Sequence, residues 1–256
     1  MSRYTRLAVA AILGLALAAT PSFAVADPIQ SITTKLKPKK LPKKRYRPAQ
    51  IRVEIITGPN TGDPISPEQP PSAFRTKVNF PKNMKFDTNQ VPRCKGTEAQ
   101  LQNTTTKQAT KVCKRKSIVS RGTGLPTGPA PTIGTSAWVT VDLPGPGTTL
   151  GVPVVVTAFN GSKKNQIFLH SRADSVNNTS ILVGRLQKGP KGFGRQLNVK
   201  IPPLLAGAIA RFTATVQNGR YVQARCKTKR MRFQAITRFT NHPTVKDDFN
   251  LKCKRR

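Results

Sequence analysis

The chain has 256 residues, of which 44 are Lys or Arg and only 10 are Asp or Glu, so its formal net charge is +34 at pH 7. A positive charge of this size favours polyanions as partners. The 22 prolines and 18 glycines argue against a mainly helical protein, because both residues interrupt helices.

The N-terminus has the three parts of an export signal. Arg3 and Arg6 precede a run of 13 apolar residues at positions 7–19, and small residues follow at Ala24 and Ala26. A membrane-spanning helix needs about 20 apolar residues, so this run is too short for a permanent anchor. We therefore expect residues 1–26 to be a signal peptide cleaved after Ala26, and the mature chain to be secreted or associated with the cell surface.

The next segment, residues 27–48, is dense in cations and prolines. Removing Arg3 and Arg6 leaves 42 Lys and Arg against 10 Asp and Glu in the mature chain. Like charges repel and repeated prolines stay extended, so we expect residues 27–48 to be a disordered linker. Its cations are expected to contact an anionic cell-wall polymer or another extracellular polyanion, unless the charge serves only solubility. They are Lys35, Lys37, Lys39, Lys40, Lys43, Lys44, Arg45 and Arg47.

Residues 49–256 have the pattern of an all-β domain. Ile51, Val53 and Ile55 alternate with charged residues, and this period of two predicts a half-buried strand. The run at 152–159 carries no charge and predicts a central, buried strand. Similar short runs recur between turn residues, at 74–80, 117–120, 136–143, 153–159, 166–170, 181–186, 196–201, 211–216, 221–226 and 231–239. This spacing predicts a single antiparallel β-sandwich, with jelly-roll and Ig-like topologies both left open.

Two local signals stand out within this pattern. Asn218-Gly219 is the strongest hairpin signal, because both central turn positions need positive φ. Thr97 is placed to cap a short helical turn at 98–101, which is the one helical hint.

The four cysteines predict disulfides. An even number of cysteines in an exported chain is typical of a disulfide framework, and four allow three pairings. We favour the local pairing, which closes two loops of about 20–30 residues. A zinc site is disfavoured because no C-x-x-C spacing is present, and no cofactor is expected. The favoured pairs are Cys94 with Cys113 and Cys226 with Cys253.

No arrangement of side chains predicts catalysis. His170, Ser171 and Asp174 are close in sequence, but neighbouring residues of a strand point to opposite faces. Asp247 and Asp248 are the only adjacent carboxylates and are expected in a turn. We therefore expect no catalytic residue and no metal site.

The order of several short motifs resembles an uncharacterised family of exported, disulfide-containing β-rich proteins from soil actinobacteria. The motifs are NFPKNMKF at 79–86, VPRC at 91–94, SIVSRGTG at 117–124, FNG at 159–161, GRL at 184–186, L-x-V-x-IP at 197–202 and Y-x-x-A-x-C at 221–226. The chain departs from the family pattern at Ser120, where a glycine is expected, and at Met231, where a tryptophan is expected. The resemblance implies export, disulfides and a β fold. The resemblance implies no activity, so it assigns a functional role to no residue of this chain.

These observations together favour an exported, non-catalytic binding or surface-associated protein. The alternative is an enzyme of an unrecognised type that acts on cell-wall carbohydrate.

The export signal generates the first testable prediction. Intact-mass measurement of protein collected from outside the producing cell should give a chain that begins at Asp27, because the peptidase acts after Ala26. Exported protein that still carries Met1 or Ser2 would contradict the predicted localisation.

Overall fold

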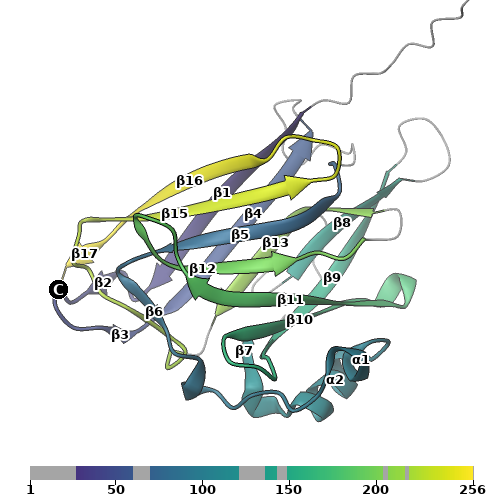
Figure 1. Cartoon of the computed structure of the whole chain (residues 1–256), viewed down its shortest axis with the longest axis horizontal. Coiled ribbons are helices and arrows are strands. Elements are labelled where there is room, and N and C mark those ends of the chain that lie inside the picture. Colours follow the sequence, from purple (N-terminus) through teal and green to yellow (C-terminus); the bar gives the residue numbers. More distant parts are fainter. Residues whose placement is uncertain are drawn as a thin grey trace, which may run out of the picture.

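An antiparallel sheet of 12 strands forms the body of the protein (Figure 1). The computed structural model describes residues 27–59, 70–120, 136–142, 149–203, 207–216 and 219–255, so the predicted signal peptide lies outside the described residues. The strand order is β1-β4-β13-β8-β9-β10-β11-β12-β5-β15-β16, and β7 pairs with β9. The strands are β1 (Pro28–Lys37), β4 (Gln50–Pro59), β5 (Ala73–Pro81), β7 (Ile118–Ser120), β8 (Ser136–Asp142), β9 (Thr149–Asn160), β10 (Gln166–Ala173), β11 (Asn178–Lys188), β12 (Phe193–Lys200), β13 (Gly207–Val216), β15 (Arg230–Phe239) and β16 (Val245–Lys252).

The sheet folds back on itself into two facing layers. In Figure 1, β16, β15, β5, β12 and β11 lie in front of β1, β4, β13, β8 and β9. The predicted all-β antiparallel sandwich is confirmed. Both layers belong to one continuous sheet, whereas an Ig-type sandwich has two separate sheets.

The two end strands of the sheet, β1 and β16, meet and close it. They pack against each other, and the backbone N–H of Ile32 on β1 donates to Asp247 Oδ2 on β16 at 2.6 Å. The sequence predicted that Asp247 and Asp248 lie in a turn. This prediction is wrong, because both residues lie within β16. The alternation along β16 puts Asp247 on the half-buried face and Asp248 outside, where it pairs with Arg232 (Nε to Oδ1, 2.8 Å).

The prediction that residues 27–48 form a disordered linker is wrong. Residues 28–37 form β1 and pair with β4 along its whole length, while Ile32, Leu36 and Leu41 are buried. A strand needs only one apolar face, so Lys35 and Lys37 remain exposed on the other. The Lys and Pro composition suggested disorder, but the alternation within the segment decided its structure. The folded domain therefore begins well before residue 49.

Two small sheets and several short helices complete the fold. β2 (Lys40–Leu41) pairs in parallel with β17 (Lys254–Arg255), and β14 (Val222–Ala224) joins β3 (Arg47–Pro48) to β6 (Met84–Phe86). The helices are α1 (Glu98–Leu101), α2 (Thr106–Cys113) and the 3-10 turns η1 (Thr88–Gln90), η2 (Arg115–Ser117) and η3 (Asp174–Val176). Within the described residues, no helix combines the length and the apolar character needed to cross a membrane.

The local signals had mixed outcomes. Thr97 caps α1 as predicted, and its side chain accepts from the N–H of Gln100. The same T-x-x-Q capping pattern at Thr105 and Gln108 marks α2, which the sequence analysis missed. Asn218 lies outside the described residues. The strands on either side of it, β13 and β14, belong to different sheets, so they do not form the predicted hairpin.

The apolar residues divide into two clusters. The main cluster fills the space between the layers, and a smaller one lies between the helices and the outer face of β9 and β10. On β9, Val152, Val154 and Val156 point into the main cluster, whereas Phe159 packs in the smaller one. The predicted buried strand at 152–159 is thus confirmed, with Val155 half-buried.

Both predicted disulfides are present, Cys94 with Cys113 and Cys226 with Cys253. The first lies in the smaller cluster beside α1 and α2. The second ties the segment after β14 to the segment between β16 and β17.

The closure of the sheet generates the second prediction. Asp247→Ala should lower the free energy of unfolding by about 1.5–3 kcal/mol, because it removes a charged acceptor from a backbone N–H. Urea unfolding measures this loss, and amide exchange at Ile32 should accelerate in the same variant. Asp248→Ala is the matched control, since its partner Arg232 is exposed, and its loss should be clearly smaller. Equal losses in the two variants would contradict a special role for Asp247.

Candidate functional site

The predicted polyanion contacts lie on folded structure. Lys35 and Lys37 belong to β1, and the other six lie on or beside β2 and β3 at one end of the protein (Figure 1). All eight cations between Lys35 and Arg47 are exposed. Figure 1 shows β2, β3, β6 and β17 together at the end where the C-terminus lies. Pairing of these strands puts Lys254 opposite Lys40 and Arg47 opposite Ala224, so segments far apart in sequence contribute to one surface.

We call this surface the basic end. Its cations come from the segments around β2 and β3, around β6, after β14, and around β17. They are Lys39, Lys40, Lys43, Lys44, Arg45, Arg47, Lys82, Lys85, Arg225, Lys227, Lys229, Arg230, Lys252, Lys254 and Arg255. All are exposed except Arg225, which is half-buried.

The cations of the basic end are not neutralised by acids. The ion pairs within the described residues join Arg52 and Arg211 to Glu54, Arg172 to Asp174, and Arg232 to Asp248, and none includes the basic end. Asp87 lies beside it, but its carboxylate accepts hydrogen bonds from Asn89 and Gln90 in η1. The positive potential of this surface is therefore available to a partner.

Backbone hydrogen bonds and a disulfide hold the basic end in shape. Cys226 N–H donates to the carbonyl of Pro42 at 2.8 Å, and Cys253 N–H donates to that of Lys229 at 2.8 Å. The Cys226–Cys253 disulfide joins the segment after β14 to the segment between β16 and β17 at the same place. Because Leu41 has no exposed surface, its side chain anchors the segment that carries the lysines.

Tyr46 organises cations from two other segments of the chain. Its hydroxyl donates to the carbonyl of Lys82 at 3.1 Å. Lys85 Nζ lies 4.3 Å from the centre of its ring and the Arg225 guanidinium 4.4 Å from it. The ring attracts both cations through its negative face and so offsets part of their mutual repulsion.

A groove of about 650 Å³ borders the basic end. Tyr46, Lys82 and Lys85 form one part of its wall, and Phe193 and Arg195 form another. Lys188 adds a further cation, and Asp87 is the one acid among the described residues of the wall. The sequence analysis did not find Lys82, Lys85, Lys188 or Arg195, because each stands outside the dense Lys/Pro run.

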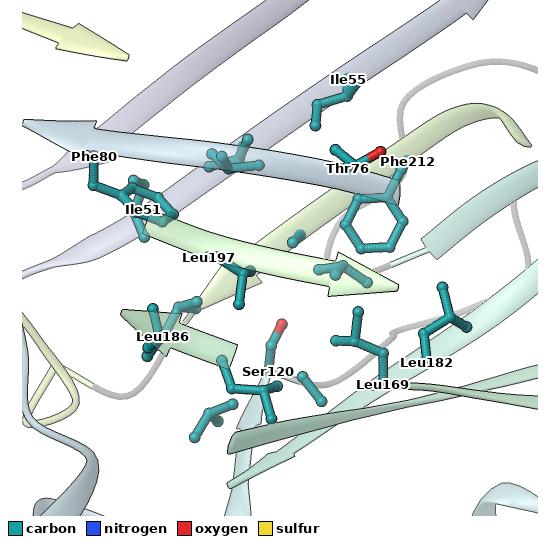
Figure 2. Close-up of a pocket in the computed structure, with 18 of the residues that line it drawn as sticks. Ile51, Ile55, Thr76, Phe80, Ser120, Leu169, Leu182, Leu186, Leu197 and Phe212 are labelled. Atoms are coloured by element: carbon teal, nitrogen blue, oxygen red, sulfur yellow. The ribbon is translucent and has the colours of Figure 1, made fainter. Parts of the chain in front are cut away.

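A second feature is an apolar cavity between the two layers (Figure 2). Its volume is about 120 Å³. Figure 2 shows Phe80, Leu186, Leu197 and Phe212 around it, with Ser120 among the few polar side chains. The wall comes from β4, β5, β6, β7, β9, β10, β11, β12, β13 and β15, from Ile201 just after β12, and from Tyr221. Sequence periodicity predicts which face is apolar but not how completely the side chains fill the interior.

The sequence neighbours His170 and Asp174 have separate partners. His170 has no exposed surface, and its Nε2 lies 3.0 Å from the hydroxyl and 3.1 Å from the carbonyl of Thr104. Asp174 pairs with Arg172, whose guanidinium also donates to Asn177 and Thr179. These contacts tie the segment between α1 and α2 to β10 and η3 and leave the imidazole in a structural role. Within the described residues, no group of three His, Cys, Asp or Glu side chains could hold a metal ion.

The burial of His170 generates the third prediction. Burial lowers its pKa below the ordinary value of about 6.5, the hydrogen bond to the Thr104 carbonyl opposes this shift, and the nearby charge of Arg172 adds to it. Protonation of His170 is less favourable in the folded state than in the unfolded state. The contribution of the neutral imidazole to the free energy of unfolding is therefore fully present above about pH 6.5, and it decreases as the pH drops from there through the folded-state pKa.

The measurement is urea unfolding at pH 7.5 and 5.0. The difference between the free energies of unfolding at these two pH values should be smaller in His170→Asn than in the wild type. It should persist in Thr104→Val, which removes the hydroxyl but keeps the imidazole and the backbone carbonyl. An unchanged difference in His170→Asn would show that another group causes the pH dependence.

Comparison with known proteins adds no functional assignment to this geometry. No model of a known protein family matches the sequence, and no curated protein is significantly similar to it. The function is therefore inferred from the residues and contacts of the protein itself.

Proposed function

We propose that the protein is an exported, non-catalytic protein that binds a linear anionic polymer through its basic end. The observation that carries this proposal is the gathering of exposed cations from four separate chain segments onto one surface without acidic partners. A charge that served only solubility would need no such gathering, since repulsion favours spacing like charges apart.

An extended ligand fits this surface better than a small anion. The cations run from the groove lined by Lys82 and Lys85 to the C-terminal strand β17, and almost all are exposed to solvent. A site for one small anion instead has buried donors that converge on a single point. A polymer can contact many exposed cations at once, and each contact releases a counterion.

The basic end supports recognition of charge rather than of bases. Proteins that bind single-stranded nucleic acids stack bases on free aromatic faces. The Tyr46 ring is already engaged by Lys85 and Arg225, so we assign it to holding these cations. We therefore expect anionic cell-wall polymers, acidic polysaccharides and DNA to bind in order of charge density.

The folded backbone makes the surface stiffer than a tail. Residues 39–47 are anchored by Leu41, by the pairing of β2 with β17 and by the hydrogen bond from Cys226 to Pro42. Less conformational entropy is then lost when the polymer binds. The enzyme alternative gains no support from the adjacent carboxylates Asp247 and Asp248, which are engaged by Ile32 and Arg232.

The test is a salt titration of binding to teichoic acid, heparin and duplex DNA. The variant Lys39→Gln, Lys40→Gln, Lys43→Gln, Lys44→Gln and Arg45→Gln removes five exposed cations and leaves the backbone contacts in place. Between 50 and 300 mM salt, the log–log slope of affinity should flatten by about 3 to 5 units. Deleting residues 27–48 is not a suitable test, because it also removes β1.

The matched control removes the same number of exposed cations near α1, α2 and η2. It carries Lys95→Gln, Lys107→Gln, Lys111→Gln, Arg115→Gln and Lys116→Gln. Its slope should change by less than about one unit, and thermal melts should show both variants folded. Equal flattening in the two variants would mean that the net charge alone determines binding. A wild-type protein that binds none of the polymers at 150 mM salt would overturn the proposal.

A further inference from the structure

We propose that the cavity between the layers binds one small, neutral alkyl carbonyl compound, such as a ketone or an ester, with Tyr221 as its hydrogen-bond donor. This inference is independent of the basic end and concerns the interior of the protein (Figure 2).

The size of the cavity sets the size of the ligand. An enclosed apolar cavity of about 150 Å³ accommodates benzene in another protein, and the cavity here has a volume of about 120 Å³. A molecule with a chain of about five to seven carbon atoms is of comparable size.

The chemistry of the wall requires an apolar ligand body. The wall consists almost entirely of aliphatic and aromatic side chains, among them Ile51, Leu169, Leu182 and Leu197, which Figure 2 shows around the space. A water molecule in such a space needs two to four polar partners, and the hydroxyls of the wall are mostly engaged. Thr76 and Thr237 lie within hydrogen-bond distance of each other at 3.1 Å, and Ser120 donates to the carbonyl of Thr215.

Tyr221 is the exception among these polar groups. Its side chain is 1 % exposed and forms part of the cavity wall. Its hydroxyl has no hydrogen-bond partner among the described residues, and burial raises the pKa of this hydroxyl above its ordinary value. The O–H group therefore remains protonated and is a donor that lacks an acceptor.

The surroundings of Tyr221 fix the position of this hydroxyl. The ring packs edge-on against Phe86 at 6.4 Å between ring centres, and Phe86 in turn packs against Phe80 at 4.6 Å. A ring held in this way cannot easily turn to find another partner. A ligand oxygen that accepts from Tyr221 removes the cost of an unsatisfied buried donor.

The ligand must also be neutral. None of the described residues in the wall is charged, so a carboxylate would lose its hydration without gaining an opposite charge. A carbonyl oxygen of a ketone or an ester supplies an acceptor without this cost.

The experiment compares three probes of similar size on the mature chain: 2-hexanone, n-heptane and hexanoate at pH 7.5. Binding is followed by NMR shifts of the methyl groups that line the cavity and by the rise in Tm with probe concentration. We expect the ketone and the alkane both to bind and hexanoate to bind most weakly, and the ratio of ketone affinity to alkane affinity measures the contribution of the donor. Affinity should be the same at 50 and 300 mM salt, in contrast to polymer binding at the basic end.

Two variants assign the donor. Tyr221→Phe should lower the affinity for 2-hexanone about tenfold and leave that for n-heptane unchanged. Tyr46→Phe, which removes a hydroxyl at the basic end, should change neither. If Tyr221→Phe keeps the wild-type ratio of ketone affinity to alkane affinity, or if hexanoate binds as tightly as the ketone, the proposed ligand class is wrong. If neither the ketone nor the alkane shifts the lining methyl groups, the cavity is not a binding site.

Discussion

Closure of the sheet is the constraint on which the other features depend. An open sheet would leave β1 and β16 as edges with unpaired backbone groups, which invite association with other chains. It would also expose to water the apolar inner faces that now form the main cluster. The contact between β1 and β16, in which the Ile32 N–H donates to the Asp247 carboxylate, covers both edges and keeps the apolar inner faces away from water. The cavity can exist only because the sheet closes around it.

A chain of side-chain amides adds order on the outside of the front layer. Gln187 donates to Gln196, Gln196 to Asn79, and Asn79 to Gln234, so the chain crosses β11, β12, β5 and β15. Gln234 continues it towards Asp248 on β16 at 3.3 Å. Each of these bonds requires one particular register between neighbouring strands. The amides therefore favour the observed alignment of strands that are far apart in the sequence.

The strong positive charge is compatible with this fold because strands separate their two faces. On β1, Ile32 and Leu36 face the core while Lys35 and Lys37 face solvent. Charged heads remain hydrated outside, and the apolar side chains contribute the burial that stabilises the domain. The same separation makes the two proposed sites independent, since one uses the outer charges at the end of the molecule and the other uses the apolar interior.

The features that the sequence by itself determined are the local ones. A period of two in the apolar residues predicts strands wherever one face is buried, and short separations predict the pairing of Cys94 with Cys113 and of Cys226 with Cys253. The cap at Thr97 is equally local. In residues 27–48 the same alternation was present, but the Lys and Pro composition outweighed it in the prediction.

Only the tertiary structure decided the features that join distant segments. Asp247 acquires its role from Ile32, which lies 215 residues away, and Tyr46 gathers Lys85 and Arg225 from two other parts of the chain. The unpartnered hydroxyl of Tyr221 is a property of the space around it and not of its neighbours in sequence. Pairing partners, cavities and unsatisfied donors depend on how the sheet closes, and closure brings together residues whose separation along the chain carries no periodic signal.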